Sequence, residues 1–180
     1  MPPFRKLAEH EVYRGHLITV GQARFAGPDG DEFDRDIVHH PGAVSCVPIV
    51  DGTHVIMVRQ FRAAIEDDLL EIPAGKRDVA GEVPELTAHR ELEEEIGMRA
   101  GRMVKLAEFY NSPGFTDEHS FVFMGLDLTE VGALDPQGPE EHLMTIERVA
   151  LADIPELIAS GRLMDAKSII GISLAREALR

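Results

Sequence analysis

Residues 82–98 read EVPELTAHRELEEEIGM and form the most informative segment of the chain. Pro84 is suited to the first position of a helix, because that position needs no backbone N–H donor. No helix-breaking residue follows until Gly97, and glycine is typical of a helix end. We therefore predict a helix from Pro84 to Ile96.

Acidic residues dominate this helix, at positions 82, 85, 91, 93, 94 and 95. Residues three and four apart share a helix face, so Glu91, Glu94 and Glu95 are expected to converge. Arg90 lies four residues before Glu94 and can hold its carboxylate. A cluster of carboxylate oxygens suits Mg²⁺ or Mn²⁺, and the ion relieves the repulsion between the like charges. A solvated acidic face is the alternative that this segment alone leaves open.

The segments around the helix are mostly strand-like. Strands are expected at residues 12–14, 17–20, 33–38, 43–50, 54–61, 104–109 and 120–126, with helices at 154–159 and 165–179. This irregular alternation predicts an α/β fold, a sandwich with a mixed sheet. We divide the chain into a strand-rich N-terminal region, 1–40, and a main domain, 41–180.

Composition narrows the function. The 18 Lys and Arg residues face 32 Asp and Glu residues, a net charge of -14, which argues against binding to nucleic acid or to an anionic membrane. Cys46 is the single cysteine, which excludes an intrachain disulfide and a Cys-cluster zinc site. Residues 1–6 lack the apolar core of a signal peptide, so we expect a cytoplasmic protein.

One family motif covers the helix and the loop before it. Gly75, Glu82 and the run from Arg90 to Met98 resemble the Nudix box, which reads Gly, five residues, Glu, seven residues, Arg-Glu, an aliphatic residue, any residue, Glu-Glu, any residue, Gly and an aliphatic residue. Six residues, not five, separate Gly75 from Glu82 here. The extra residue falls in the loop, so the helical spacing is intact.

The resemblance implies a Nudix-like α/β/α sandwich that hydrolyses a nucleoside diphosphate linked to another group. It implies Mg²⁺ as cofactor, with Mn²⁺ possible, because pyrophosphate cleavage needs charge neutralisation and an activated water. Glu91 and Glu95 are then the principal metal ligands, with Glu94 close by and the Ala74 carbonyl as a further ligand. Arg90 would orient the carboxylates, and Glu82 would join their charge network.

A second resemblance indicates the substrate. Residues 112–118, SPGFTDE, are similar to the segment that follows the box in ADP-ribose pyrophosphatases, and Pro113 lies sixteen residues beyond Gly97. The expected reaction is cleavage of ADP-ribose to AMP and ribose 5-phosphate. Another nucleoside diphosphate sugar, such as a GDP-sugar, is the nearest alternative. A ligand sensor without activity is a third, disfavoured by the intact box carboxylates.

Five residues are candidates for substrate binding: Arg59, Arg62, Pro113, Gly114 and Glu118. A guanidinium fork suits phosphate oxygens, which favours the two arginines. Pro113 and Gly114 would shape the pocket, and Glu118 would bind a ribose diol.

The catalytic base is expected outside the helix, since the box glutamates serve as ligands. In this subfamily a later loop usually supplies it, here residues 135–142, whose Pro and Gly content suits closure over a substrate. We favour Glu141, with Glu140 next. The resemblance further implies a homodimer that exchanges N-terminal strands.

Overall fold

The computed structural model describes residues 3–132, 134–135 and 138–180, and the chain divides into two units. The first unit comprises Met1–Ala43 and Phe109–Ser120, and the second comprises Val44–Glu108 and Phe121–Arg180. The strands are β1 (Arg5–Arg14), β2 (Thr19–Ala26), β3 (Glu32–His39), β4 (Ala43–Val50), β5 (His54–Arg62), β6 (Asp67–Glu71), β7 (Ala74–Lys76), β8 (Met98–Tyr110), β9 (His119–Glu130) and β10 (Thr145–Ala150). The helices are α1 (Pro84–Ile96), the 3₁₀ turn η1 (Glu141–Leu143), α2 (Ile154–Ala159) and α3 (Ala166–Ala178).

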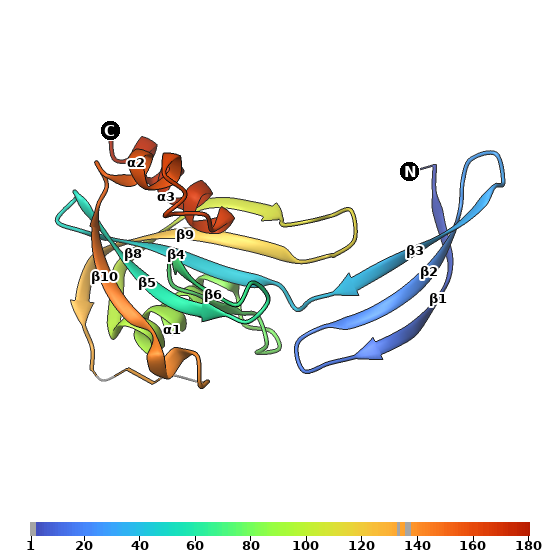
Figure 1. Cartoon of the computed structure of the whole chain (residues 1–180), viewed down its shortest axis with the longest axis horizontal. Coiled ribbons are helices and arrows are strands. Elements are labelled where there is room, and N and C mark those ends of the chain that lie inside the picture. Colours follow the sequence, from blue (N-terminus) through green and yellow to red (C-terminus); the bar gives the residue numbers. More distant parts are fainter. Residues whose placement is uncertain (1–2, 133, 136–137) are drawn as a thin grey trace. The chain divides into compact units, whose positions relative to one another are not determined.

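The larger unit is built on a mixed sheet with helices on both of its faces (Figure 1). The described strands run in the order β10-β5-β4-β9-β8, with β6 beside β5 and β7 beside β4. Helix α1 covers one face, and α2 and α3 cover the other. The predicted α/β/α sandwich is therefore confirmed.

Strand β4 shows why the sandwich forms. Its side chains alternate between the two faces of the sheet, and both faces are covered. Val44 and Cys46 join the buried cluster that holds the apolar stripe of α1. Val47, pointing the other way, lies against Gly171 of α3. A strand covered on both faces is expected to be mostly apolar, and residues 43–50 are apolar except for Ser45, which is buried.

Helix α1 has the predicted bounds. Pro84 occupies its first turn, and Gly97 ends it in the left-handed conformation with φ 65°. A Cβ at Gly97 would lie 2.8 Å from the Gly132 carbonyl oxygen, so glycine is required there for space as well as for φ.

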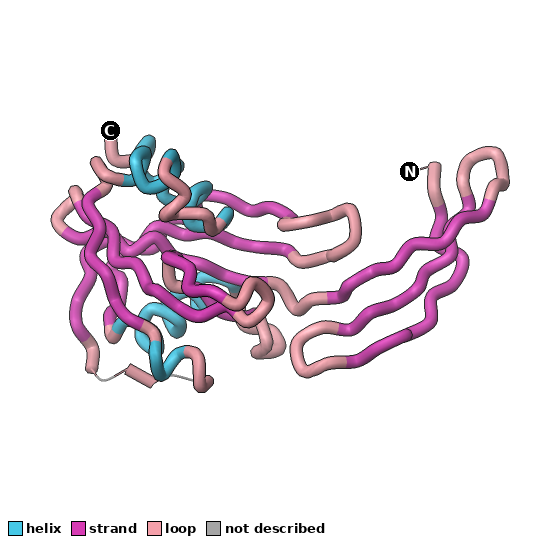
Figure 2. Tube along the Cα trace, in the orientation of Figure 1, coloured by secondary structure: helices cyan, strands magenta, loops and turns pink. Residues whose placement is uncertain are grey.

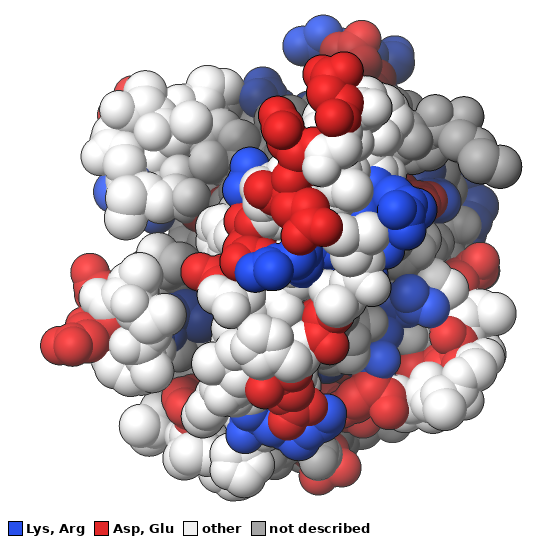
Figure 3. All heavy atoms as spheres, turned by 90° about the vertical axis from the view of Figure 1, so that its right-hand side faces the viewer, with Lys and Arg blue, Asp and Glu red and all other residues white. Residues whose placement is uncertain are grey.

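The first unit contains a three-stranded antiparallel sheet in the order β1-β2-β3 (Figure 2). The segment 109–120 belongs to this unit although it lies some seventy residues away along the chain. Acidic and basic side chains are interspersed on the face shown in Figure 3.

Strand β10 was not expected from the sequence. It pairs antiparallel with β5, from Thr145 opposite Arg59 to Ala150 opposite His54. It is an edge strand of the sheet, and half of its residues, TIERVA, are polar. It therefore lacks the apolar run by which a buried strand is recognised in a sequence. The predicted loop 135–142 lies between β9 and β10, and its residues 136–137 lie outside the described residues. None of the helices described here combines the length and the apolar character that a membrane span needs.

Candidate active site

Two of the three converging carboxylates are buried. Glu91 and Glu95 expose 8% and 4% of their surface, and Glu94 is half-buried. They share a face of α1 because four and three residues separate them along the helix. A purely solvated acidic face does not describe such a helix.

Arg90 organises the carboxylates around it. Its Nη1 lies 2.8 Å from Oε1 of Glu91 and 2.9 Å from Oε2 of Glu94. Its Nη2 lies 3.7 Å from Oε2 of Glu82, which also accepts a hydrogen bond from the Thr87 hydroxyl at 2.7 Å. Arg90 thus contacts Glu82, Glu91 and Glu94, and its orienting role stays a prediction.

Strand β7 lies directly against this carboxylate face. The Ala74 N–H donates a hydrogen bond to Oε2 of Glu95 at 3.0 Å. At Gly75 a Cβ would overlap the carboxyl group of Glu91, so any larger residue would displace that group. The glycine of the box is therefore needed for close approach. The additional residue lies in the loop between β7 and α1 and leaves this contact intact.

Burial makes the charged form of both glutamates unfavourable. The pKa of Glu91 is raised to about 7, chiefly by burial, with the carboxylates of Glu94 and Glu141 also raising it and the charge of Arg90 opposing them. Burial also raises the pKa of Glu95 to about 8, with contributions from Glu91 and Glu141. Carboxylates held in this way are under-compensated, and a divalent cation would supply the missing positive charge.

The donor set fits a hard divalent cation, since it consists of carboxylate oxygens with the Ala74 carbonyl beside them. Within residues 3–132, 134–135 and 138–180, no three His, Cys, Asp or Glu side chains are arranged so that they could bind one metal ion together. Arg90 instead engages oxygens of Glu91 and Glu94. Ion binding would therefore require these side chains to turn from Arg90, and the ligand roles stay predictions.

Arg62 is held by a buried ion pair. Its Nε and Nη2 donate to Oε1 and Oε2 of Glu71, both at 2.6 Å, and Glu71 is only 1% exposed. Lys167 at the start of α3 also binds Glu71 and lies 3.0 Å from Asp165. The charge of Arg62 lowers the pKa of Glu95, opposing the effect of burial. Arg62 thus acts electrostatically on the box.

The sequence analysis assigns no role to Glu71. It is the one charged residue in the apolar segment 69–73, and a charge in a buried strand requires a partner. The sequence does not identify that partner, because Lys167 is 96 positions away.

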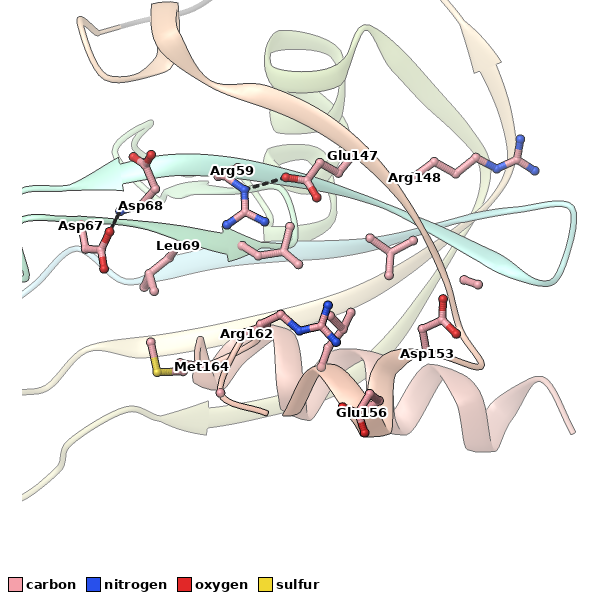
Figure 4. Close-up of a pocket in the computed structure, with 15 residues that line it drawn as sticks. Arg59, Asp67, Asp68, Leu69, Glu147, Arg148, Asp153, Glu156, Arg162 and Met164 are labelled. Atoms are coloured by element: carbon pink, nitrogen blue, oxygen red, sulfur yellow. Dashed lines mark hydrogen bonds and ion pairs between the residues drawn. The ribbon is translucent and has the colours of Figure 1, made fainter. Parts of the chain in front are cut away.

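Arg59 faces a different part of the larger unit. It lines a cavity of about 660 Å³, and its Nε donates to Oε1 of Glu147 at 2.6 Å (Figure 4). Arg162 and Met164, from the segment between α2 and α3, line the same cavity. Val58, the preceding residue, packs with α1, so Arg59 points to the other sheet face. The structure groups Arg62, and not Arg59, with the box.

The other substrate-binding candidates belong to the first unit. Pro113 and Gly114 are exposed in a tight turn, in which the Phe115 N–H donates to the Ser112 carbonyl at 3.1 Å. Glu118 is half-buried, with Oε1 4.0 Å from Nδ1 of His40. Their contacts with substrate stay predictions.

The two candidate bases differ in their surroundings. Glu140 is exposed, and Glu141 is half-buried at the start of η1, just before β10. The charge of Glu141 raises the pKa of both Glu91 and Glu95. Glu141 therefore shares the electrostatic environment of the predicted metal ligands.

The α/β/α sandwich and the packing of the carboxylates of α1 against Gly75 of β7 together indicate the family. The chain matches the NUDIX domain over residues 39–167 and belongs to that family. The ADP-ribose pyrophosphatase of Bacillus subtilis (strain 168) is 38% identical to it over 98% of this chain and 95% of its own. The methanol dehydrogenase activator of Bacillus methanolicus is 34% identical with the same coverage. A solved structure of an ADP compounds hydrolase matches with a TM-score of 0.85 over 99% of this chain and 95% of its own, at 24% identity, which supports the fold.

Proposed function

We propose that the chain hydrolyses the pyrophosphate bond of ADP-ribose, giving AMP and ribose 5-phosphate. The observation that carries this is the buried pair Glu91 and Glu95 packed against β7, in a chain 38% identical to an ADP-ribose pyrophosphatase over 98% of its length. The reaction adds one water across the P–O–P bridge, so each product keeps one phosphate.

The predicted metal ligands, Arg90 and Glu141 have distinct parts in this reaction. Bound Mg²⁺ or Mn²⁺ would neutralise the pyrophosphate and acidify the attacking water. Glu91, Glu95, Glu94 and the Ala74 carbonyl would hold it. Arg90 keeps the carboxylates oriented until they bind. Glu141 accepts the proton of the water as its oxygen attacks phosphorus.

A substrate panel tests the proposal. With Mg²⁺ present, kcat/KM should be highest for ADP-ribose among ADP-ribose, ADP-glucose, GDP-mannose and NADH, with AMP and ribose 5-phosphate as products. A tenfold preference for GDP-mannose, about 1.4 kcal/mol of transition-state stabilisation, would select the GDP-sugar alternative. Binding of ADP-ribose without turnover would select the sensor.

Arg62 and Arg59 form a matched pair for testing phosphate recognition. We expect Arg62→Gln to raise KM for ADP-ribose roughly ten- to a hundredfold, the range for losing a hydrogen bond to a charged group. Arg59→Gln should change KM less than about threefold, because Arg59 faces the other side of the sheet. Thermal unfolding of both variants controls for the loss of the ion pairs with Glu71 and Glu147. Equal increases in KM for Arg62→Gln and Arg59→Gln would instead indicate that Arg59 also contacts the substrate.

We also propose a homodimer in which residues 1–40 exchange between subunits. The support is the subfamily resemblance, together with the exposed apolar side chains of Val12 and Tyr13 on β1, which are 62% and 58% exposed. Light scattering should give twice the mass of the 19.8 kDa chain. A single-chain mass at micromolar concentration would contradict the dimer. The cytoplasmic location stays a prediction.

A further inference from the structure

His39, at the end of β3, bridges two carboxylates within the first unit. Its Nε2 lies 2.5 Å from Oε1 of Glu9 on β1, and its Nδ1 lies 2.6 Å from Oδ2 of Asp117. An ionised carboxylate only accepts hydrogen bonds, so both ring nitrogens must donate. The geometry therefore selects the doubly protonated imidazolium.

Asp117 belongs to the loop that carries Pro113, Gly114 and Glu118. Its second oxygen accepts the His40 N–H at 2.8 Å, and its own N–H donates to the Val38 carbonyl at 3.2 Å. The Val38 N–H donates to the Phe115 carbonyl at 2.7 Å. Through these hydrogen bonds the loop runs beside the end of β3, where Val38 and Thr116 form an isolated parallel β-bridge. His39 adds the charged bond, and it ties the same loop to β1 through Glu9.

The charges around His39 are mainly negative. Facing it are Glu9 and Asp117, and the β2 residue opposite it is the neutral Thr19. Other charged or titratable groups nearby are Lys6, which is 2.6 Å from Oε2 of Glu9, the Glu11–Arg14 pair on β1, and His40 with Glu118 on the loop side. The ring Nδ1 of His40 accepts the Gly42 N–H at 3.1 Å.

We propose that His39 is a positioning residue whose imidazolium fastens the Ser112–Glu118 loop to β3 and β1, and so sets the affinity for substrate through Pro113, Gly114 and Glu118. This inference rests on the proposed function for its link to substrate. His39 contacts no reacting atom in this scheme. Its loss should therefore raise KM and leave kcat nearly unchanged.

The pH dependence follows from the two hydrogen bonds. Those to Glu9 and then Asp117 raise the pKa of His39 above its ordinary value of 6.5. The bridge is therefore complete below that value and is lost as the pH rises through the raised pKa. KM should stay constant at low pH and increase on the alkaline side.

The central test compares His39→Gln with wild type across pH. A glutamine side chain has both of its N–H donors on one nitrogen and an acceptor oxygen beside it, so it cannot donate from two separate positions as Nδ1 and Nε2 of the imidazolium do. We expect KM for ADP-ribose at pH 6 to rise about tenfold, kcat to change less than about twofold, and the alkaline rise in KM to disappear. His16→Gln, an exposed histidine in the same unit, is the matched control and should behave as wild type.

Two measurements do not depend on turnover. Hydrogen exchange at the Val38 and Asp117 amides should accelerate in His39→Gln and not in His16→Gln, because these amides join β3 to the loop. Glu9→Gln, which keeps the Asp117 contact, should lower the pKa of His39 in an NMR titration. Unchanged amide exchange, or an unchanged KM profile, in His39→Gln would overturn the proposal. Failure of the proposed function would appear differently, as absent turnover of ADP-ribose by wild type.

Discussion

Glu95→Gln and Glu91→Gln should each lower turnover of ADP-ribose by about two orders of magnitude or more and weaken Mg²⁺ binding. Each substitution replaces a buried carboxyl group, which would bind the ion as a carboxylate, with a neutral amide on the face that approaches β7. Turnover measured against Mg²⁺ concentration, with calorimetry for ion binding, checks both effects. Full wild-type activity in excess chelator would eliminate a metal mechanism altogether.

Glu93→Gln is the matched control for these variants. Glu93 lies on the same helix and is half-buried, but its carboxylate pairs with Arg99 at 2.6 Å and not with Arg90. Its replacement should leave Mg²⁺ binding and turnover close to wild type. If Glu93→Gln were as damaging as Glu95→Gln, a general loss of helix α1 would explain the results better than a site.

Stability offers a separate check in metal-free protein. The pKa of Glu95 is raised to about 8 from an ordinary 4.5, so the folded state holds its proton more tightly than the unfolded state. Stability contributed by this group is complete below pH 4.5 and declines as the pH rises to about 8. Glu95→Gln removes that decline, so the variant should be at least as stable as wild type at pH 8. Thermal unfolding in chelator measures this.

Glu141→Gln is expected to lower kcat by about two orders of magnitude or more, with little change in Mg²⁺ affinity, because a positioned general base contributes ~10²–10⁴-fold. The charge of Glu141 acts on both Glu91 and Glu95, which places its carboxylate in their environment. Single-turnover kinetics with saturating ADP-ribose isolates the chemical step.

Glu140→Gln is the control for this second expectation and should have the smaller effect, since Glu140 is exposed. A crippling effect at Glu140 would keep the loop as the source of the base and change the residue. Losses of less than about threefold in both variants would remove the loop from the mechanism. Glu91, Glu94 and Glu118 would then be the remaining candidates for the base.

Local features were readable from the chain because they depend on short-range geometry. The bounds of α1 follow from Pro84 and Gly97, and both are confirmed. The strand at residues 43–50 follows from a mostly apolar run, and its bounds are confirmed. Strand β10 was not predicted, because half of its residues are polar and it lies at the edge of the sheet. It therefore lacks the apolar run that identifies a buried strand.

The shared face of Glu91, Glu94 and Glu95 was readable from the chain, because helical periodicity fixes which residues share a face, and the resemblance to the Nudix box indicated the fold. The pairing of Arg62 with Glu71, and the position of Arg59 in a cavity with Glu147, became clear only in the folded protein. Those contacts depend on strand register and on which sheet face each side chain meets. A shift of one residue reverses every side chain in a strand, and no local pattern distinguishes the two arginines.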